Sequence, residues 1–489
     1  MKKCLVVLLL LPVFANAQID LPLALQTPPL GTSHGEMMTF LTKIVAKSVL
    51  LELEIAGKSS VGRDIPVVYF PKRNHWRSHR ATIMLFAQQH GNEPSGKEAL
   101  LMLIHELNAK RGQARYRNLN LILVPMANPD GNELYQRRNG NQVDLNRNHL
   151  LLSEPETQLL HQLFERYRPE VTLDIHEYGP TGWLALGLLK DLGEQLDCIS
   201  NPAIPVPLKR FAVTEILEPA LDSTMLKGVK AGRYLITGAD PTQPARHSTT
   251  DIDDGRNSFG IHYTLSFILE GMAGFSKSDR IWERAKSQLT MIKAFLNICD
   301  AKAGAITSIV RHWRKQSLHQ VPDTVIIQAN YTEKYSRPLT VNVTRCCDRR
   351  DTTIILSDYR PNPEPIVFVL RPKAYLIEQP DSTVLSVLKH HLLPYRVLVA
   401  DTLCRVEQFE VTGIDTLRFE GRETLIPAGS YTRKEKNFSR GCILVPTNHG
   451  RAILLVQMLE PQSFYGLSHY AEFQFLSQNK FYPIYRLIE

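Results

Sequence analysis

The stretch at residues 86–98 reads Phe-Ala-Gln-Gln-His-Gly-Asn-Glu-Pro-Ser-Gly-Lys-Glu, and the interpretation of the chain starts from it. At its centre, His90 and Glu93 stand three positions apart. The apolar run at 81–87 before it predicts a buried strand, and the apolar spacing of 96–104 after it predicts a helix. The two side chains therefore lie on a strand-to-helix loop, where an α/β sheet places its ligand sites. Taken alone, such a pair is as common in a surface loop or a helix cap as in a ligand site.

A catalytic zinc site needs three protein ligands and one open position, and zinc accepts both imidazole and carboxylate. The third ligand is expected at a neighbouring strand end. The run at 171–175 predicts a buried strand, and His176 stands at its carboxyl end. Asp174, Glu177 or a backbone carbonyl can orient the His176 ring. Taken alone, a histidine in this place is more often a buried core residue whose ring nitrogens form hydrogen bonds within the protein.

Two further features supply the other groups that such a site requires. Residues 137–148 contain three arginines and four asparagines. A guanidinium binds a carboxylate through two N–H groups and amides add donors, so this segment suits a substrate carboxylate. Glu270 ends an apolar run, where a carboxylate facing a metal-bound water can act as a general base. In isolation, a polar surface loop and an exposed strand end explain the two features equally well.

The hydrophobic periodicity of the first 300 residues alternates between strand and helix patterns, which indicates an α/β fold with a mixed, mostly parallel sheet flanked by helices. A hairpin is expected near the start. Ser153 is expected to cap one helix, with Glu156 completing a capping box, and residues 128–131 are expected to form a turn. The predicted strands are 51–55, 65–70, 81–87, 119–125, 171–175 and 261–269, and the predicted helices are 36–49, 95–108, 154–167 and 281–296.

A length of 489 residues suggests two or three domains. Short β-branched runs punctuated by Pro and Gly follow the α/β part and predict a β-rich C-terminal region of one or two modules, with one short helix at 382–391. The predicted strands there are 325–328, 339–344, 352–356 and 366–370. The expected division is a signal peptide at 1–17, a leader at 18–35, a catalytic domain at 36–303 and the β-rich region at 304–489, with the boundary falling within 303–322.

The N-terminus has the pattern of a secretory signal. Lys2 and Lys3 are followed by a short apolar run at 5–14 and by Ala15-Asn-Ala17, a typical cleavage site. The expected location is therefore secreted or periplasmic, with no stable membrane span after cleavage; an N-terminal anchor is the alternative. Six cysteines remain beyond the leader, enough for three disulfides whose pairing the sequence does not fix. The formal charge of +8 is scattered, so no nucleic-acid partner is expected.

Taken together and in order along the chain, these motifs resemble the metallocarboxypeptidase family of zinc exopeptidases (the M14 class, carboxypeptidase A-like). The resemblance covers roughly residues 36–300, and a set of ordered motifs is far more specific than any one of them. Segments at 371–377, 426–431 and 459–462 look more vaguely like the tail of some exported bacterial relatives. The motifs are Gly57-Lys-Ser-x-x-Gly-Arg-Asp-Ile65, His90-x-x-Glu93, Asn128-Pro-Asp-Gly131, Arg137-x-Asn139, Asp144-x-Asn146-Arg147-Asn148, Asp174-Ile-His176 and Glu270.

The resemblance implies a zinc-dependent carboxypeptidase fold and activity. His90, Glu93 and His176 would hold one Zn²⁺ per chain together with a water molecule. Glu270 would take a proton from that water as general base and pass it to the leaving amine.

The resemblance also implies how the substrate, a peptide with a free C-terminal carboxylate, would be held. Arg137 would polarise the scissile carbonyl and stabilise the oxyanion. Asn146 and Arg147 would bind the terminal carboxylate. The family's mobile tyrosine has no secure match, since Tyr263 falls in a predicted strand, and Arg256 is only a candidate for the residue that sets side-chain specificity.

The sequence therefore predicts an exported enzyme that hydrolyses C-terminal peptide bonds. A cell-wall peptide amidase or deacylase on the same scaffold is one alternative. A catalytically inert binding or surface protein, whose β-rich region does the work, is another. The full set of ligands and a candidate base argues against the inert protein, because such a protein has no need of them.

Overall fold

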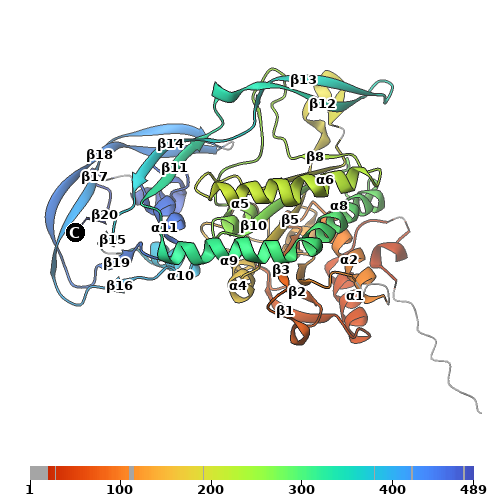
Figure 1. Ribbon diagram of the computed structural model, residues 1–489, viewed down its shortest axis with the longest axis horizontal. Helices are drawn as coiled ribbons and strands as arrows, with labels where there is room; N and C mark the ends of the chain where they lie inside the picture. The colour runs from red at the N-terminus through yellow and green to blue at the C-terminus, as the bar shows by residue number, and fades with distance from the viewer. Residues whose placement is uncertain are drawn as a thin grey trace, which may run out of the picture.

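A computed structural model describes residues 20–488 except 28, 110–114, 191, 379, 420–421 and 477–478. The predicted signal peptide at 1–17 lies outside the described residues. Figure 1 shows the α/β part of the chain at the centre and right, with the β-rich C-terminal region beside it at the left.

The strands of the first half form an eight-stranded mixed sheet within the described residues. Its centre is parallel, because β3 pairs in parallel with both β4 and β5, and β5 pairs in parallel with β10. The predicted hairpin is confirmed as the antiparallel pair β1–β2 at one edge. In spatial order the strands are β1 (Glu52–Lys58), β2 (Asp64–Phe70), β4 (Leu119–Val124), β3 (Ala81–Ala87), β5 (Val171–Tyr178), β10 (Leu265–Met272), β7 (Glu194–Cys198) and β8 (Ala231–Arg233).

Both faces of this sheet are covered by helices, which confirms the predicted α/β class. Ile83 and Leu85 of β3 pack into one hydrophobic core, whereas Met84 and Phe86 pack into a second core on the opposite face. Alternate residues of a strand point to opposite faces, so a strand buried on both sides is apolar throughout. The helices of this half are α1 (His34–Ala46), α2 (Ser95–Asn108), α3 (Pro129–Leu134), α4 (Pro155–Tyr167), α5 (Val206–Phe211), α6 (Glu218–Met225), α7 (Gly255–Gly260), α8 (Ile281–Ala301) and α9 (Ala303–His319).

Three local predictions are wrong in detail. The segment 128–131 is the start of α3 rather than a free turn, because the Asn128 side chain accepts a hydrogen bond from the Gly131 N–H (2.8 Å) and caps the helix. Helix α4 is preceded by Glu154, with Pro155 at its first position, so Ser153 does not cap it.

The predicted strand at 261–269 is the third error. The observed strand is β10, which begins only at Leu265. The apolar residues before it belong to α7 and to the turn at Tyr263, which has a φ of 59°. A short apolar run has no period long enough to separate a buried helix from a strand, so the sequence merged the two elements.

The predicted boundary region at 303–322 is occupied largely by α9. Ile306 and Val310 of this helix are fully buried in the main core. The predicted strands beyond it are confirmed, each with longer bounds. The elements of this region are β11 (Thr324–Asn330), β12 (Arg337–Arg345), β13 (Asp351–Arg360), β14 (Glu364–Leu370), β15 (Ala374–Ile377), α10 (Ser382–His390), β16 (Arg396–Val397), β17 (Thr402–Phe419), β18 (Arg422–Phe438), β19 (Ile443–Pro446), α11 (Ala452–Leu459) and β20 (Ile484–Leu487).

The C-terminal region is joined to the first half through a shared sheet. Strands β12 and β13 pair with each other and also with β6 (Leu188–Lys190) and β9 (Ala245–Arg246) from the first half. Figure 1 shows this hairpin reaching from the C-terminal region across the top of the α/β part. The Tyr359 hydroxyl on β13 also lies 2.5 Å from His247 Nε2. The β-rich region therefore helps to build the surface above the central sheet.

Two other expectations concern cysteines and membrane spans. The six cysteines beyond the predicted leader are all described, and each is a free thiol in the structure. Within the described residues, no helix combines the length and the apolar character needed to cross a bilayer.

Close backbone packing beside the loop at 88–94 gives a first prediction. A Cβ atom on Gly91 would lie 2.0 Å from the Gly131 carbonyl carbon, so Gly91→Ala should force the loop away from α3. We expect the free energy of unfolding to fall by roughly 1–3 kcal/mol, as for overpacked interiors. Urea denaturation of the variant beside the wild type measures this.

The matched control is Gly35→Ala on α1, where a new Cβ would meet nothing within 4 Å. We expect its stability to stay within about 1 kcal/mol of wild type, with any change favouring the alanine in a helix. Equal unfolding midpoints for the two variants would contradict this account of the loop.

Candidate metal centre

The loop between β3 and α2 is fixed by contacts with the start of α3. The Asn128 Nδ2 group donates to the Gln89 carbonyl (2.9 Å), and the Asn128 N–H donates to the Gln88 carbonyl (3.1 Å). Gln88 itself adopts a φ of 59°, which turns the chain sharply out of the strand. These constraints direct His90 and Glu93 back over the carboxyl end of β5.

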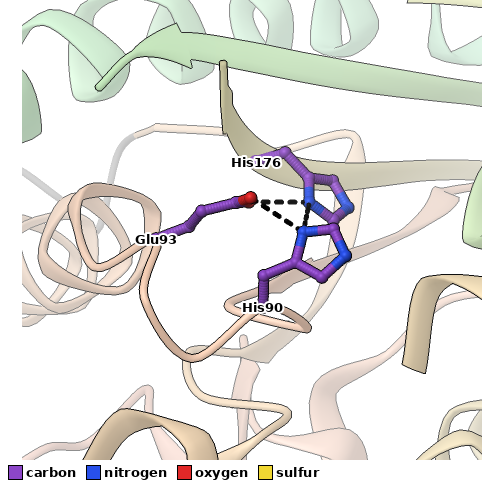
Figure 2. Close-up of side chains that lie close together, drawn as sticks. All are labelled: His90, Glu93 and His176. Atoms are coloured by element: carbon purple, nitrogen blue, oxygen red, sulfur yellow. Dashed lines mark hydrogen bonds and ion pairs between the residues drawn. The ribbon is translucent and has the colours of Figure 1, made fainter. Parts of the chain in front are cut away.

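His90, Glu93 and His176 converge, as Figure 2 shows. His90 Nδ1 lies 2.8 Å from Glu93 Oε1, and His176 Nδ1 lies 2.9 Å from Glu93 Oε2. The two Nδ1 atoms are 3.1 Å apart. All three side chains are buried, and one ligand atom from each falls within 4.8 Å of the others. Donor atoms that face a common point at this spacing are arranged as the ligands of a single cation.

A carboxylate beside each imidazole holds the Nδ1 atom toward the common point. His176 Nε2 lies 2.8 Å from Asp174 Oδ1, and His90 Nε2 lies 3.1 Å from Asp144 Oδ1. Asp174 and His176 are two residues apart on β5 and so share a face of the sheet. Of the two carboxylates expected to orient His176, Asp174 is the one beside the ring, whereas Glu177 turns away and accepts from the Ser95 N–H (3.1 Å).

The pKa shifts in this cluster are mutual. Burial raises the pKa of Glu93, but His90 and His176 outweigh it and hold the pKa of the carboxyl well below its usual range. Burial likewise opposes protonation of His176, yet Asp174 and Glu93 raise the pKa of its ring well above the ordinary value. The site thus favours positive charge at the point where the three ligand atoms meet.

Glu270 lies beside the triad on the adjacent strand. It pairs in register with His176 across β10 and β5. Thr172 and Ser266, two pairs earlier on this face, place their hydroxyl oxygens 2.5 Å apart, which shows that facing pairs share one side of the sheet. Burial, reinforced by Glu93, raises the pKa of Glu270 to about 7, although the two imidazoles oppose the shift. The carboxylate is therefore desolvated and close to the metal ligands.

The polar segment at 137–148 brings its predicted residues to the same place. Arg137 is about half exposed, its Nε lies 2.9 Å from Asp144 Oδ2, and its Nη1 lies 3.7 Å from Glu93 Oε1. The Arg147 guanidinium donates to the Asn146 carbonyl (2.6 Å). The Asn146 side chain is buried, with Nδ2 3.2 Å from His176 Nε2 and Oδ1 accepting from the Gly255 N–H (2.8 Å).

The remaining two candidates, Tyr263 and Arg256, have structural contacts of their own. Tyr263 is buried in the main hydrophobic core, in the turn between α7 and β10. Arg256 on α7 is fully buried, and its Nη2 donates to the Thr249 carbonyl (2.8 Å) and to Asp254 Oδ2 (3.0 Å).

Tyr234 is a residue that the sequence analysis missed. Its N–H donates to the Leu196 carbonyl (3.1 Å), which places it just beyond β8. Burial and the Glu270 carboxylate raise the pKa of its hydroxyl, while Arg147 is among the cations that oppose the shift. The phenol is therefore within electrostatic range of Glu270, the candidate base, and of Arg147, the candidate group for binding a substrate carboxylate. Because no motif surrounds Tyr234, only the fold identifies it.

The donor set fits zinc. Two imidazole nitrogens and one carboxylate are the ligands of many catalytic zinc sites, which keep a fourth position open. Both rings have a carboxylate on their far nitrogen, the arrangement that fixes tautomer and orientation in such sites. The residues present thus meet the requirements of a zinc centre.

Comparison with known proteins finds similarity to carboxypeptidases. The model of the zinc carboxypeptidase family, Peptidase M14, matches residues 37–152, which include His90 and Glu93. Carboxypeptidase 2 of Trichophyton rubrum is 25% identical over 482 residues, covering 94% of this chain and 87% of the relative. Carboxypeptidase 2 of Trichophyton tonsurans is 25% identical over 452 residues, covering 88% and 81%. The solved carboxypeptidase A of Helicoverpa armigera aligns with 56% of this chain and 74% of its own, at 18% identity and a TM-score of 0.43.

The class of protein is thus a metallocarboxypeptidase, a peptide hydrolase. Within that class, the chain is similar to the M14 family of zinc carboxypeptidases, whose model matches residues 37–152.

The contact between Asp144 and His90 gives a prediction about metal affinity. Asp144→Asn removes the charge beside His90 Nε2 and should weaken zinc binding by about 10–100-fold, as is typical when the partner of a metal-bound histidine is lost. Competition with a chromophoric chelator measures the dissociation constant. The control is Asp64→Asn, which removes a carboxylate from an exposed pair with Lys58. Unchanged zinc affinity in Asp144→Asn would show that this carboxylate does not support the site.

Proposed function

We propose that the protein is a zinc-dependent carboxypeptidase that removes the C-terminal residue of peptides, with one zinc ion per chain held by His90, Glu93 and His176. The observation that carries the proposal is the convergence of these buried groups with Glu270 on one face and one edge of the central sheet. A set of donors with a desolvated carboxylate beside it matches what metal-assisted hydrolysis requires.

Bound zinc would lower the pKa of a water molecule and polarise a carbonyl oxygen. Glu270 takes the role of general base, because a buried carboxylate whose pKa lies near neutrality both accepts and returns a proton readily. After accepting the proton of the attacking water, it delivers a proton to the departing amine. The pairing with β5 and β7 on either side holds the backbone at Glu270 in place during both transfers.

Arg137 and Arg147 take the two anionic parts of the substrate. Arg137 is half exposed at the edge of the triad, so its guanidinium can donate to the oxyanion that forms on the scissile carbonyl. Arg147, with Asn146 beside it, binds the terminal carboxylate and so limits cleavage to the last peptide bond. The Tyr234 hydroxyl, within electrostatic range of Glu270 and Arg147, is a candidate for a further donor to the bound terminus.

We also propose that the protein is exported, in the secreted or periplasmic space. The support is the charged, apolar and small-residue pattern of residues 2–17.

The proposed base is tested by Glu270→Gln, which keeps the shape of the side chain and removes its basicity. We expect kcat to fall by about 10²–10⁴-fold, while mass spectrometry of the native protein still finds about one zinc per chain. A peptide release assay gives the turnover.

Glu194→Gln is the matched control for that variant. Glu194 pairs with Gly271 on the neighbouring strand and is also buried, and burial raises the pKa of its carboxyl well above the usual value, so a neutral amide replaces it with little change. We expect near wild-type turnover. A Glu270→Gln enzyme that retains full turnover would refute the assignment of the base.

Exopeptidase action is tested with one peptide in two forms, with a free or an amidated C-terminus. We expect cleavage of the free acid only. Arg147→Met should lower kcat/KM for the free acid by about 10–100-fold, because hydrogen bonds between charged groups contribute about 1.5–3 kcal/mol. Arg138→Met serves as the control, because Arg138 is an exposed neighbour whose guanidinium donates to the Gln142 carbonyl (3.3 Å). Equal cleavage of acid and amide would favour an amidase on the same scaffold.

A further inference from the structure

A pocket distinct from the metal centre lies where the β12–β13 hairpin meets the first half of the chain. Its volume is ≈ 560 Å³, within the range of ligand sites. One wall comes from β6 and the segment before it, a second from the loop after β10, and a third from the end of β12 and the turn that follows. We call it the hairpin pocket.

The hairpin pocket is strongly cationic. Its lining includes Lys190, Arg280, Arg345 and Arg349 but only one carboxylate, Asp279. Asp348 pairs with Arg345 (2.5 Å), and Asp279 lies 3.8 Å from Arg280. After these pairs are counted, Lys190 and Arg349 are left without an ion pair to a described carboxylate, and Glu270 is the carboxylate whose charge favours the protonated form of Lys190 against its burial.

The pocket opens close to the metal centre on the same face of the sheet. Met272 lines it and stands two residues beyond Glu270 on β10, so both side chains point to one face. Two residues of strand span about 7 Å. Lys190 lies over the ring of Tyr178, which is likewise two residues beyond His176 on β5. A bound peptide needs only about two extended residues to pass from the reacting bond to the pocket.

The pocket is separate from the groups proposed to hold the C-terminal carboxylate. Its lining shares no residue with Arg137, Asn146, Arg147 or Tyr234. The terminal residue occupies those groups, so the part of a peptide that remains to reach the pocket is the segment on the other side of the reacting bond.

We propose that the hairpin pocket is a subsite for acidic side chains of the peptide, at positions two to four residues before the scissile bond. Cations facing an apolar floor bind carboxylates through hydrogen bonds assisted by charge. The assignment rests on the proposed exopeptidase function, and it gives the C-terminal region a share in substrate selection, because the hairpin supplies two of the cations. The enzyme would thus prefer peptides with glutamate or aspartate near the C-terminus.

Binding to the zinc-loaded Glu270→Gln protein tests this subsite without relying on turnover. The probes are fluorescent hexapeptides that share their last two residues and carry Glu-Glu, Gln-Gln or Lys-Lys at the two preceding positions. Fluorescence anisotropy should show the Glu-Glu peptide binding at least about fivefold more tightly than Gln-Gln, as expected for a partly exposed ion pair. Added salt should reduce the difference.

Charge reversal on the hairpin, Arg345→Glu with Arg349→Glu, should abolish or invert this preference. Arg210→Glu with Lys227→Glu changes the net charge equally at exposed positions away from the pocket and should leave the preference intact. Equal affinities for the three peptides, or a preference that survives reversal on the hairpin, would overturn the assignment.

A blocked dipeptide, too short to reach the pocket, separates this proposal from the proposed function. In the otherwise wild-type enzyme it should be cleaved equally well with and without the hairpin reversal. Loss of its cleavage in the hairpin variant would mean that the hairpin supports the catalytic site itself, and would overturn the subsite. Failure of the wild type to cleave it would refute the exopeptidase function, whereas the anisotropy series decides the subsite by itself.

Discussion

The structure depends on an electrostatic constraint, the burial of several carboxylates within one small volume. Glu93, Asp174 and Glu270 are each less than a tenth exposed, and Asp144 lies directly beside His90. Buried like charges repel strongly unless protons or a cation compensate them. The raised pKa values of Glu270 and His176 are two forms of that compensation. A divalent cation at the triad would be a third, and its binding would then be linked to the stability of the folded chain.

The sheet is what makes this concentration of charge geometrically possible. Parallel strands bring their carboxyl ends to one edge, and the in-register pairing of β5 with β10 sets Glu270 beside His176. The loop after β3 adds His90 and Glu93 from the other side of β5, where close backbone contact with α3 leaves no room for a side chain at Gly91. Residues up to 180 positions apart thus meet because of strand order rather than because of any local preference.

Much of this arrangement was predictable from the sequence. The bounds of β3 and α2 agree with the predicted 81–87 and 95–108, since β3 is an unbroken apolar run, α2 has a helical period, and polar residues follow each of them. The convergence of His90, Glu93 and His176 followed from their places after buried strands. Asp144 belongs to one of the sequence motifs, but its contact with His90 depends on a loop conformation that no hydrophobic periodicity predicts.

The remaining errors and omissions have the same kind of physical origin. The start of β10 was misplaced because Tyr263 and its apolar neighbours are buried in a turn and not in a strand. Strand β6 is only three residues long and exists because β12, about 150 residues later, pairs with it. Tyr234 comes within electrostatic range of Glu270 only through the placement of β8 at the far side of the sheet. Pairings between distant segments are thus what the sequence alone failed to reveal.

The sheet shared by β6, β12, β13 and β9 has a consequence for how such a chain can change. Cutting after α9 would expose the unpaired backbone of β6 and β9, together with the apolar surface that α11 covers, and open edges of this kind promote aggregation. Shuffling modules by recombination, which works where domains meet through a flexible linker, would here separate two halves of one hydrogen-bonded layer. Sequence change in such a chain is therefore expected to proceed through substitutions and changes in loop length, and the two halves are expected to be inherited as one unit.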